Sequence, residues 1–172
     1  MRRAETKRLA LGAMLVAFAM ILSYIESLVP PLVAIPGVKL GLANIATVFV
    51  LYCLGERYAV AVSLLRVVLS SLLFGSAVSL IYSLTGAVLS LVFMILLRRI
   101  GIFTPVGVSA AGGVAHNAGQ IICAALIMEN AGLTYYLAPL TVAGVITGFV
   151  IGIAAGFVIA KIKNVTHLDI TE

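Results

Sequence analysis

The chain has 172 residues, of which 63% are hydrophobic and 10% are charged, and its mean hydropathy is +1.23. A water-soluble domain carries about 25% charged residues, so this composition excludes an ordinary soluble protein. The net charge of +5 does not indicate nucleic-acid binding, because the basic residues stand at the ends of apolar runs rather than on one soluble face. We expect no nucleic-acid partner and a lipid bilayer as the surrounding solvent.

Lipid offers the backbone no hydrogen bonds, so a chain within a bilayer must form helices or a closed barrel. Barrel strands alternate apolar and polar residues over about ten positions. The apolar runs of this chain are instead long and unbroken. We therefore expect an all-α integral membrane protein, with residues 1–172 forming a single transmembrane domain.

Six apolar runs follow one another along the chain, and a helix that crosses the hydrocarbon needs about 20 mostly apolar residues. We expect membrane-spanning helices over residues 9–28, 40–54, 58–74, 77–97, 104–128 and 136–160. The second run is the shortest. Pro30 and Pro31 end the first run, and Thr104-Pro105 begins the fifth.

The orientation of the expected bundle follows from its lysine and arginine residues, which are enriched in cytoplasmic loops. With six spans, nine basic residues fall on one side, whereas five spans would separate them. They are Arg2, Arg3, Lys7, Arg8, Arg57, Arg98, Arg99, Lys161 and Lys163. We therefore expect a six-helix bundle with both termini in the cytoplasm.

Arg66 lies halfway along the helix expected over residues 58–74, about 12 Å from either end. A charge at this depth costs about 2.5–3.5 kcal/mol of insertion free energy. Its side chain must therefore face the bundle interior, a wet cavity or an anion. Two interpretations stay open: Arg66 contacts a ligand, or it forms an internal ion pair with Glu26, near the outer end of the first helix.

The middle of the helix expected over residues 104–128 is unusually small and polar. His116, Asn117 and Gln120 are three or four residues apart, which places them on one helical face. Their hydrogen bonds either join neighbouring helices, at about 0.6 kcal/mol each, or hold a ligand. The glycines beside them, Gly113 and Gly119, favour a ligand site because they leave space.

The outer connection from Pro30 to Leu40 is apolar and stiffened by proline, and it carries a lone cation, Lys39. It fits an ordered cap over an external cavity, and it also fits an inert connector. Asn44, one turn inside the following helix, would add a second polar side chain to the lining of this external cavity. We expect the substrate in the outer half of the bundle. The expected contacts are Lys39, Asn44, Arg66, His116, Asn117 and Gln120.

Small residues recur every four positions on two helices. Gly144, Gly148, Gly152 and Gly156 form a flat ridge on the last helix, and Ala13 and Ala17 do so on the first. Such spacing allows helices to approach closely. The ridges either pack within the bundle or dock a partner membrane subunit.

Several kinds of chemistry have no residues to support them. The chain lacks a glycine-rich phosphate loop ending in Lys-Ser/Thr, so we expect no ATP hydrolysis. Asp169 is the one aspartate, whereas magnesium-dependent diphosphate chemistry needs several carboxylates. His116 and His167 lie far apart in the expected topology. We expect no catalysis, metal or cofactor, and we expect Cys53 and Cys123 to act as small hydrophobes.

Three segments together resemble one family. They are PGVKLGLAN at residues 36–44, Arg66 with SSLLFG at residues 70–75, and HNAGQ at residues 116–120. The family is called heptaprenyl diphosphate synthase component I, or Gx transporter, and the resemblance covers about residues 8–162. That family in turn resembles the substrate-binding S components of energy-coupling-factor (ECF) vitamin importers, which are six-helix bundles of the prokaryotic cytoplasmic membrane.

The resemblance implies a binding subunit that works with a membrane coupling subunit and two ATPases, with Ala13 and Ala17 docking the coupling subunit. The substrate would be a small, anionic, partly apolar molecule such as a vitamin, flavin or isoprenoid precursor, since Lys39 and Arg66 suit an anion. The family's other name implies an alternative: a non-catalytic membrane partner of a heptaprenyl diphosphate synthase. The lack of metal-binding aspartates in the membrane favours the transporter interpretation.

Overall fold

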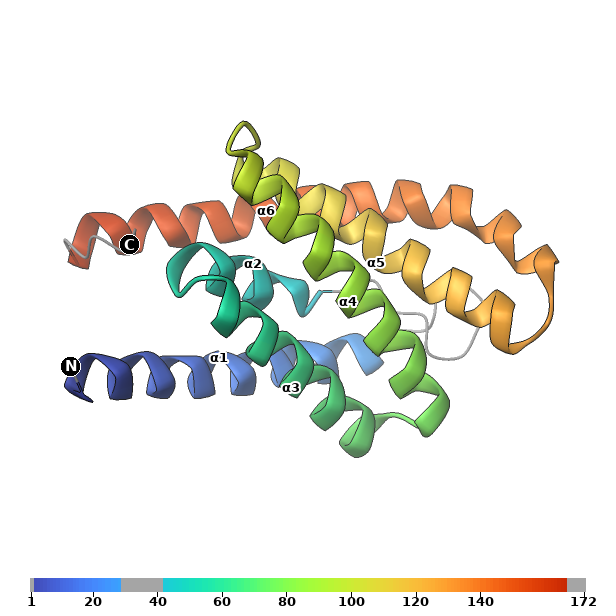
Figure 1. Ribbon diagram of the computed structural model, residues 1–172, viewed down its shortest axis with the longest axis horizontal. Helices are drawn as coiled ribbons and strands as arrows, with labels where there is room; N and C mark the ends of the chain where they lie inside the picture. The colour runs from blue at the N-terminus through green and yellow to red at the C-terminus, as the bar shows by residue number, and fades with distance from the viewer. Residues whose placement is uncertain (1, 29–41, 167–172) are drawn as a thin grey trace.

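The computed structural model describes residues 2–28 and 42–166, which form six α-helices and one short 3-10 helix (Figure 1). They are α1 (Arg2–Leu28), α2 (Asn44–Cys53), α3 (Glu56–Phe74), α4 (Ala77–Ile100), α5 (Pro105–Ile127), η1 (Ala131–Tyr136) and α6 (Leu137–Thr166). Five of the α-helices are long and apolar enough to cross a membrane. The chain is therefore a multi-pass membrane protein.

The outer surface of the bundle is apolar on every long helix. Leu72 of α3, Leu126 of α5 and Phe157 of α6 are 72%, 74% and 74% exposed. Soluble proteins seldom expose apolar patches larger than a few hundred Å². Lipid tails are the solvent that matches this surface.

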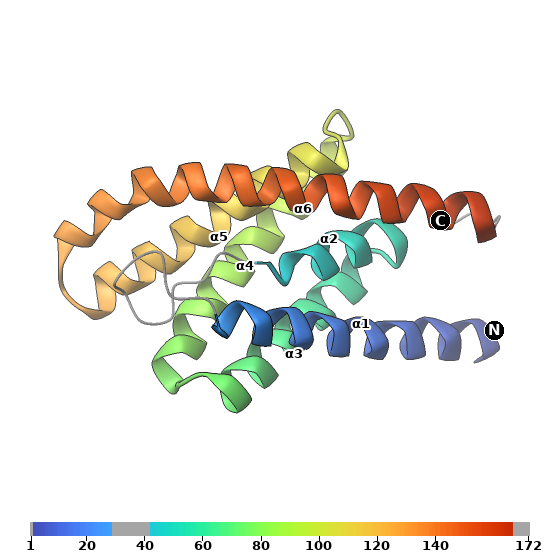
Figure 2. The ribbon, with the colours of Figure 1, turned by 180° about the vertical axis from the view of Figure 1, so that it is seen from behind.

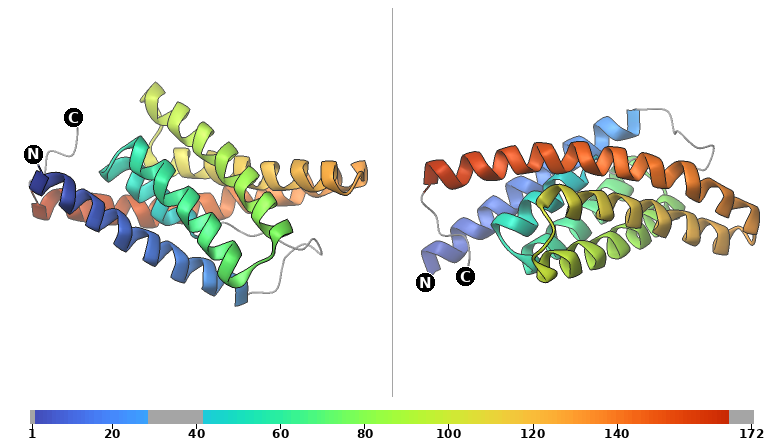
Figure 3. Two further views of the ribbon diagram at one scale, coloured as in Figure 1. Left: turned by 60° about the horizontal axis from the view of Figure 1, so that its bottom comes forward. Right: turned by 90° about the horizontal axis from the view of Figure 1, so that it is seen from above.

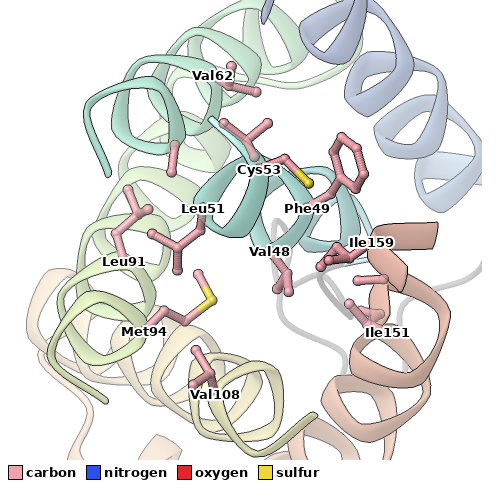
Figure 4. Close-up of a cluster of buried hydrophobic side chains, with 13 residues drawn as sticks. Val48, Phe49, Leu51, Cys53, Val62, Leu91, Met94, Val108, Ile151 and Ile159 are labelled. Carbon is pink, nitrogen blue, oxygen red and sulfur yellow. The ribbon is translucent and has the colours of Figure 1, made fainter. Parts of the chain in front are cut away.

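The helix α2 is the exception among the six, because it lies inside the bundle. It has ten residues, and all of them except Ile45 and Tyr52 are buried. Figure 4 shows α2 at the centre of a ring of helices, with Val48 and Leu51 reaching toward α6 and α4. Figure 2 shows it between α1 and α6.

Among the described residues, α2 is therefore shorter than the run expected over residues 40–54. The helix begins only at Asn44, and ten residues at a rise of 1.5 Å are about 15 Å long, half the hydrocarbon thickness. Gly55, with φ at +94°, then turns the chain into α3. That left-handed conformation favours glycine.

The chain nevertheless alternates between the two ends of the bundle. Gly12 of α1 lies beside Tyr58 of α3, and the rings of Tyr24 and Phe74 are 5.1 Å apart, so α1 and α3 run parallel. The segment between them must therefore return to the end of the bundle where α1 begins. Both termini lie at that end (Figure 1). Arg99 at the end of α4 also meets Glu56 there, at 2.6 Å.

The other half of the molecule consists of α4, α5 and α6, with α5 between its two neighbours (Figure 3). Glycines bring these helices close together. A side chain at Gly112 would lie 2.6 Å from Met94 of α4, and one at Gly148 would lie 2.6 Å from the Cα of Ala110 in α5. The close packing of α4, α5 and α6 therefore depends on these glycines.

The glycine ridge of α6 has two environments. Gly144, Gly148 and Gly152 contact α5, so packing within the bundle is confirmed for these three. A Cβ added to Gly156 would meet no atom within 4 Å, because α5 begins at Pro105, whose neighbour Val106 lies against Gly152.

The observed bounds of α5 lie within one residue of the expected ones, α2 is shorter than expected, and α1, α3, α4 and α6 are longer. Thr104 caps α5 by accepting the N–H of Gly107 at 3.3 Å, and Pro105 occupies its first turn. By contrast, α1 begins at Arg2 instead of residue 9, and α6 continues beyond residue 160 to Thr166. Lysine and arginine are good helix formers, so the end of an apolar run does not end a helix.

Candidate functional site

The interior of the bundle changes character along its length. Near the termini, the core around α2 is apolar and contains Val62, Leu91, Val108 and Ile159 (Figure 4). From the middle of α3 toward the opposite end, buried polar side chains come from five helices. They are Ser23 and Glu26 of α1, Asn44 of α2, Arg66, Ser70 and Ser71 of α3, Ser79 and Ser83 of α4, and His116, Asn117 and Gln120 of α5.

Arg66 is buried in the middle of α3, with only 4% of its surface exposed. Its Nη2 donates to the Oδ1 of Asn44 at 3.5 Å, a long hydrogen bond. Its Nε has no hydrogen-bond partner among the described residues. The prediction that Arg66 faces the bundle interior is therefore confirmed, and its donors are incompletely used.

Glu26 brings a carboxylate to the same region from the end of α1. Its side chain is buried, and its Oε1 accepts the N–H of Leu42 at 3.3 Å, just before α2 begins. It also interacts electrostatically with Arg66. The structure thus brings together Glu26, Asn44 and Arg66, from three helices.

The first turn of α2 points into this group of side chains. Ala43 is its N-cap and has no side chain that can accept a hydrogen bond from the first turn. The N–H groups of Ile45 and Ala46 donate to Leu42 and Ala43 at 3.2 and 3.3 Å. The first turn therefore carries the partial positive charge of a helix amino end without a capping side chain.

The polar residues of α5 divide between two neighbours. A side chain at Gly86 of α4 would lie 2.8 Å from the His116 carbonyl and 2.9 Å from Gln120, so this face of α5 meets α4. The side chain of Asn117 instead donates to the carbonyl of Leu140 in α6 at 2.8 Å. His116 and Gln120 thus lie against α4, whereas the Asn117 side chain joins α5 to α6.

The buried serines were missed by reasoning from the sequence. Ser63 and Ser70 flank Arg66 on the same face of α3, and Ser79 and Ser83 occupy successive turns of the buried face of α4. The signal was their spacing of three, four and seven residues, which keeps small hydroxyls on one face of each helix. The Oγ atoms of Ser23, Ser71 and Ser83 have no hydrogen-bond partner within residues 2–28 and 42–166.

Lys39 and the connection from Pro30 to Leu40 lie outside the described residues. Ala13 and Ala17 are exposed on α1, on either side of the middle of that helix. The two cysteines are buried and form no disulfide; Cys53 lies in the apolar core, and Cys123 accepts the Thr85 hydroxyl at 3.4 Å.

Comparison with known families supports one assignment. A sequence model of the family described as "Heptaprenyl diphosphate synthase component I" matches residues 15–158. Neither a curated protein nor a solved structure matches the chain. The match extends from α1 to α6 and includes Glu26, Asn44 and Arg66. This multi-pass membrane protein therefore belongs to the heptaprenyl diphosphate synthase component I family.

Proposed function

We propose that this protein is the substrate-binding subunit of an importer of the energy-coupling-factor type, in the cytoplasmic membrane of a prokaryote. It binds a small anionic molecule from outside, with both termini in the cytoplasm, and it catalyses no reaction itself. A membrane coupling subunit and two ATPases supply the energy. The ligand class extends to vitamins, flavins and isoprenoid precursors.

One observation carries this proposal: buried polar groups are concentrated in one half of a bundle whose exterior is apolar. A polar group in such an interior costs free energy unless it is hydrogen-bonded. Arg66, Ser71 and Ser83 keep buried atoms without partners among the described residues. A bound polar molecule would form hydrogen bonds with several of these atoms at once. A purely structural network would instead pair them within the protein.

Docking of the coupling subunit is assigned to the exposed face of α1. Ala13 and Ala17 are four residues apart and exposed, so a partner helix could approach the α1 backbone closely. The bundle itself leaves these two alanines uncovered, whereas it covers Gly144, Gly148 and Gly152 of the other small-residue ridge. The α1 face is the better candidate for a contact outside the chain.

Purification under mild conditions tests the proposal. The wild-type protein should retain a membrane coupling subunit and two ATPases, identified by mass spectrometry. Ala13→Leu and Ala17→Leu should release them without lowering the melting temperature. Ala61→Leu, at an exposed alanine of α3, is the matched control and should retain the partners. Loss of the partners in all three variants would contradict docking at α1.

The family description favours a second candidate, a non-catalytic membrane partner of a soluble heptaprenyl diphosphate synthase. In that role the chain would hold the synthase or its product at the membrane. The same purification separates the two functions. A synthase subunit retained without ATPases would support the second candidate and overturn the first.

A further inference from the structure

We infer that the ligand presents a carboxylate or phosphate group to a site formed by the guanidinium of Arg66 and the amino end of α2. This inference rests on the proposed binding function and adds the chemical group that is recognised and the backbone element that recognises it. It joins a buried cation, whose Nε has no partner among the described residues, to a helix end whose N-cap, Ala43, has no capping side chain.

Arg66 supplies the first half of the site. Its guanidinium is almost fully buried, and its hydrogen bond to Asn44 is long, at 3.5 Å. The Nε has no partner among the residues that the structure describes. The edge formed by Nε and Nη2 offers two parallel N–H donors, which match the two oxygens of a carboxylate or phosphate.

The amino end of α2 supplies the second half. Asn44 is the first residue of this helix, so the contact with its Oδ1 places the Arg66 guanidinium beside the first turn. A helix amino end carries about half a positive charge, which attracts anions. The N–H groups of Ile45 and Ala46 already donate to Leu42 and Ala43, so this end contributes its field rather than free donors. Two positive groups facing each other inside a protein require a compensating negative charge.

Glu26 compensates only part of this positive charge. Its Oε1 accepts the N–H of Leu42, and its charge interacts with Arg66. One carboxylate balances one guanidinium and leaves the partial charge of the helix end. The remaining field is positive, so it favours one further anionic group and discriminates against cations.

The neighbours of Arg66 on α3 are also suited to a polar ligand. Ser63 and Ser70, one turn before and one turn after it, are buried and small. A leucine or phenylalanine at either position would seal the guanidinium behind apolar surface. The hydroxyl of Ser70 donates within its own helix, to Val67 at 3.3 Å, and so it does not occupy the guanidinium.

The test uses the purified full-length chain in a maltoside detergent, without coupling proteins. Unfolding is followed with a thiol-reactive dye, because Cys53 and Cys123 are buried thiols that the dye reaches only when the protein unfolds. Sodium phosphate, pyrophosphate and acetate are the soluble probes, with sodium chloride at equal ionic strength as the reference. Phosphatidylglycerol in mixed micelles is a separate probe for a lipid headgroup.

The wild-type protein should be stabilised saturably by at least one oxyanion and not by chloride. Arg66→Lys should raise the half-saturating oxyanion concentration about tenfold, because lysine loses the two-donor edge. Glu26→Gln should lower this concentration roughly tenfold, because a negative charge near the bound anion is removed. Arg99→Gln, at an exposed arginine near the termini, should leave it unchanged. Arg66→Lys keeps the positive charge, so these variants test the site even if a neutral residue at position 66 prevents folding.

Two results would overturn the inference. One is the absence of any oxyanion or lipid response in the wild type, including a response seen only in Glu26→Gln, which would make Glu26 the resident anion. The other is an equal response in wild type and Arg66→Lys. A response to phosphatidylglycerol alone supports the site and identifies a lipid headgroup as its ligand. Anion binding without co-purifying coupling proteins would contradict the importer while leaving this site intact.

Discussion

Gly113 of α5 and Gly144 of α6 lie backbone against backbone. A side chain added to Gly144 would lie 2.9 Å from the carbonyl group of Gly113, closer than real side-chain contacts. Lipid and protein interior are equally apolar, so helix association in a membrane depends on packing rather than on the exclusion of water. Contacts of this kind hold the α4–α6 half of the molecule together.

Replacing a covered glycine of α6 should therefore destabilise the protein, while an uncovered one should tolerate the same change. In Gly148→Ala the new methyl group would lie 2.6 Å from the Cα of Ala110, and we expect a loss of about 1–3 kcal/mol. Gly156→Ala is the matched control, since a Cβ there has no neighbour within 4 Å. Thermal unfolding in detergent measures both. Equal melting temperatures for the two variants would refute the observed packing of α5 on α6.

Asn117 is expected to support the fold rather than the ligand. Asn117→Ala removes the 2.8 Å hydrogen bond to Leu140 that joins α5 to α6. Such bonds contribute about 0.6 kcal/mol on average and up to about 1.7 kcal/mol. We expect a stability loss in this range with an unchanged response to oxyanions. Asn130→Ala, which removes the exposed contact to Gly132, is the control. Loss of the oxyanion response in stable Asn117→Ala protein would return Asn117 to the ligand site.

The central position of α2 predicts a sharp difference between two leucines. Leu51 is fully buried in the core, whereas Leu72 of α3 is 72% exposed on the apolar outer surface. Leu51→Ala leaves a cavity and should cost about 2 kcal/mol of stability, near the low end for buried leucines. The cost is low because lipid solvates a leucine side chain as well as the protein core does. Leu72→Ala should change the melting temperature little. The reverse order would place α2 outside the core.

Labelling from the two sides of the membrane tests the proposed orientation. Ile102, in the turn between α4 and α5, is 79% exposed, and Tyr135, in η1, is 86% exposed at the other end of the bundle. In intact cells, an impermeant maleimide should react with Tyr135→Cys. Ile102→Cys should react only after the membrane is opened. Cys53 and Cys123 are buried and contribute little background. Labelling of Ile102→Cys in intact cells would invert the topology.

The amino-acid sequence by itself determined the membrane class, the five long helices, the sharp start of α5 at Thr104 and the family. It also singled out Arg66, because a charge inside an apolar run has no stable place except the bundle interior. These features depend on local composition and on short-range capping, which a single segment contains in full.

Only the tertiary structure decided the role of α2 and the partners of the polar residues. Hydropathy cannot distinguish a helix surrounded by lipid from one surrounded by other helices, because both surroundings are apolar, and so the central helix was read as a span. Spacing along α5 placed Asn117 with His116 and Gln120, yet the positions of α4 and α6 assign them to different neighbours. Likewise, the meeting of Glu26, Asn44 and Arg66 depends on how α1, α2 and α3 pack, since 40 residues separate the first from the last. Contacts between segments so distant in the chain are set by the packing of whole helices, which no local pattern encodes.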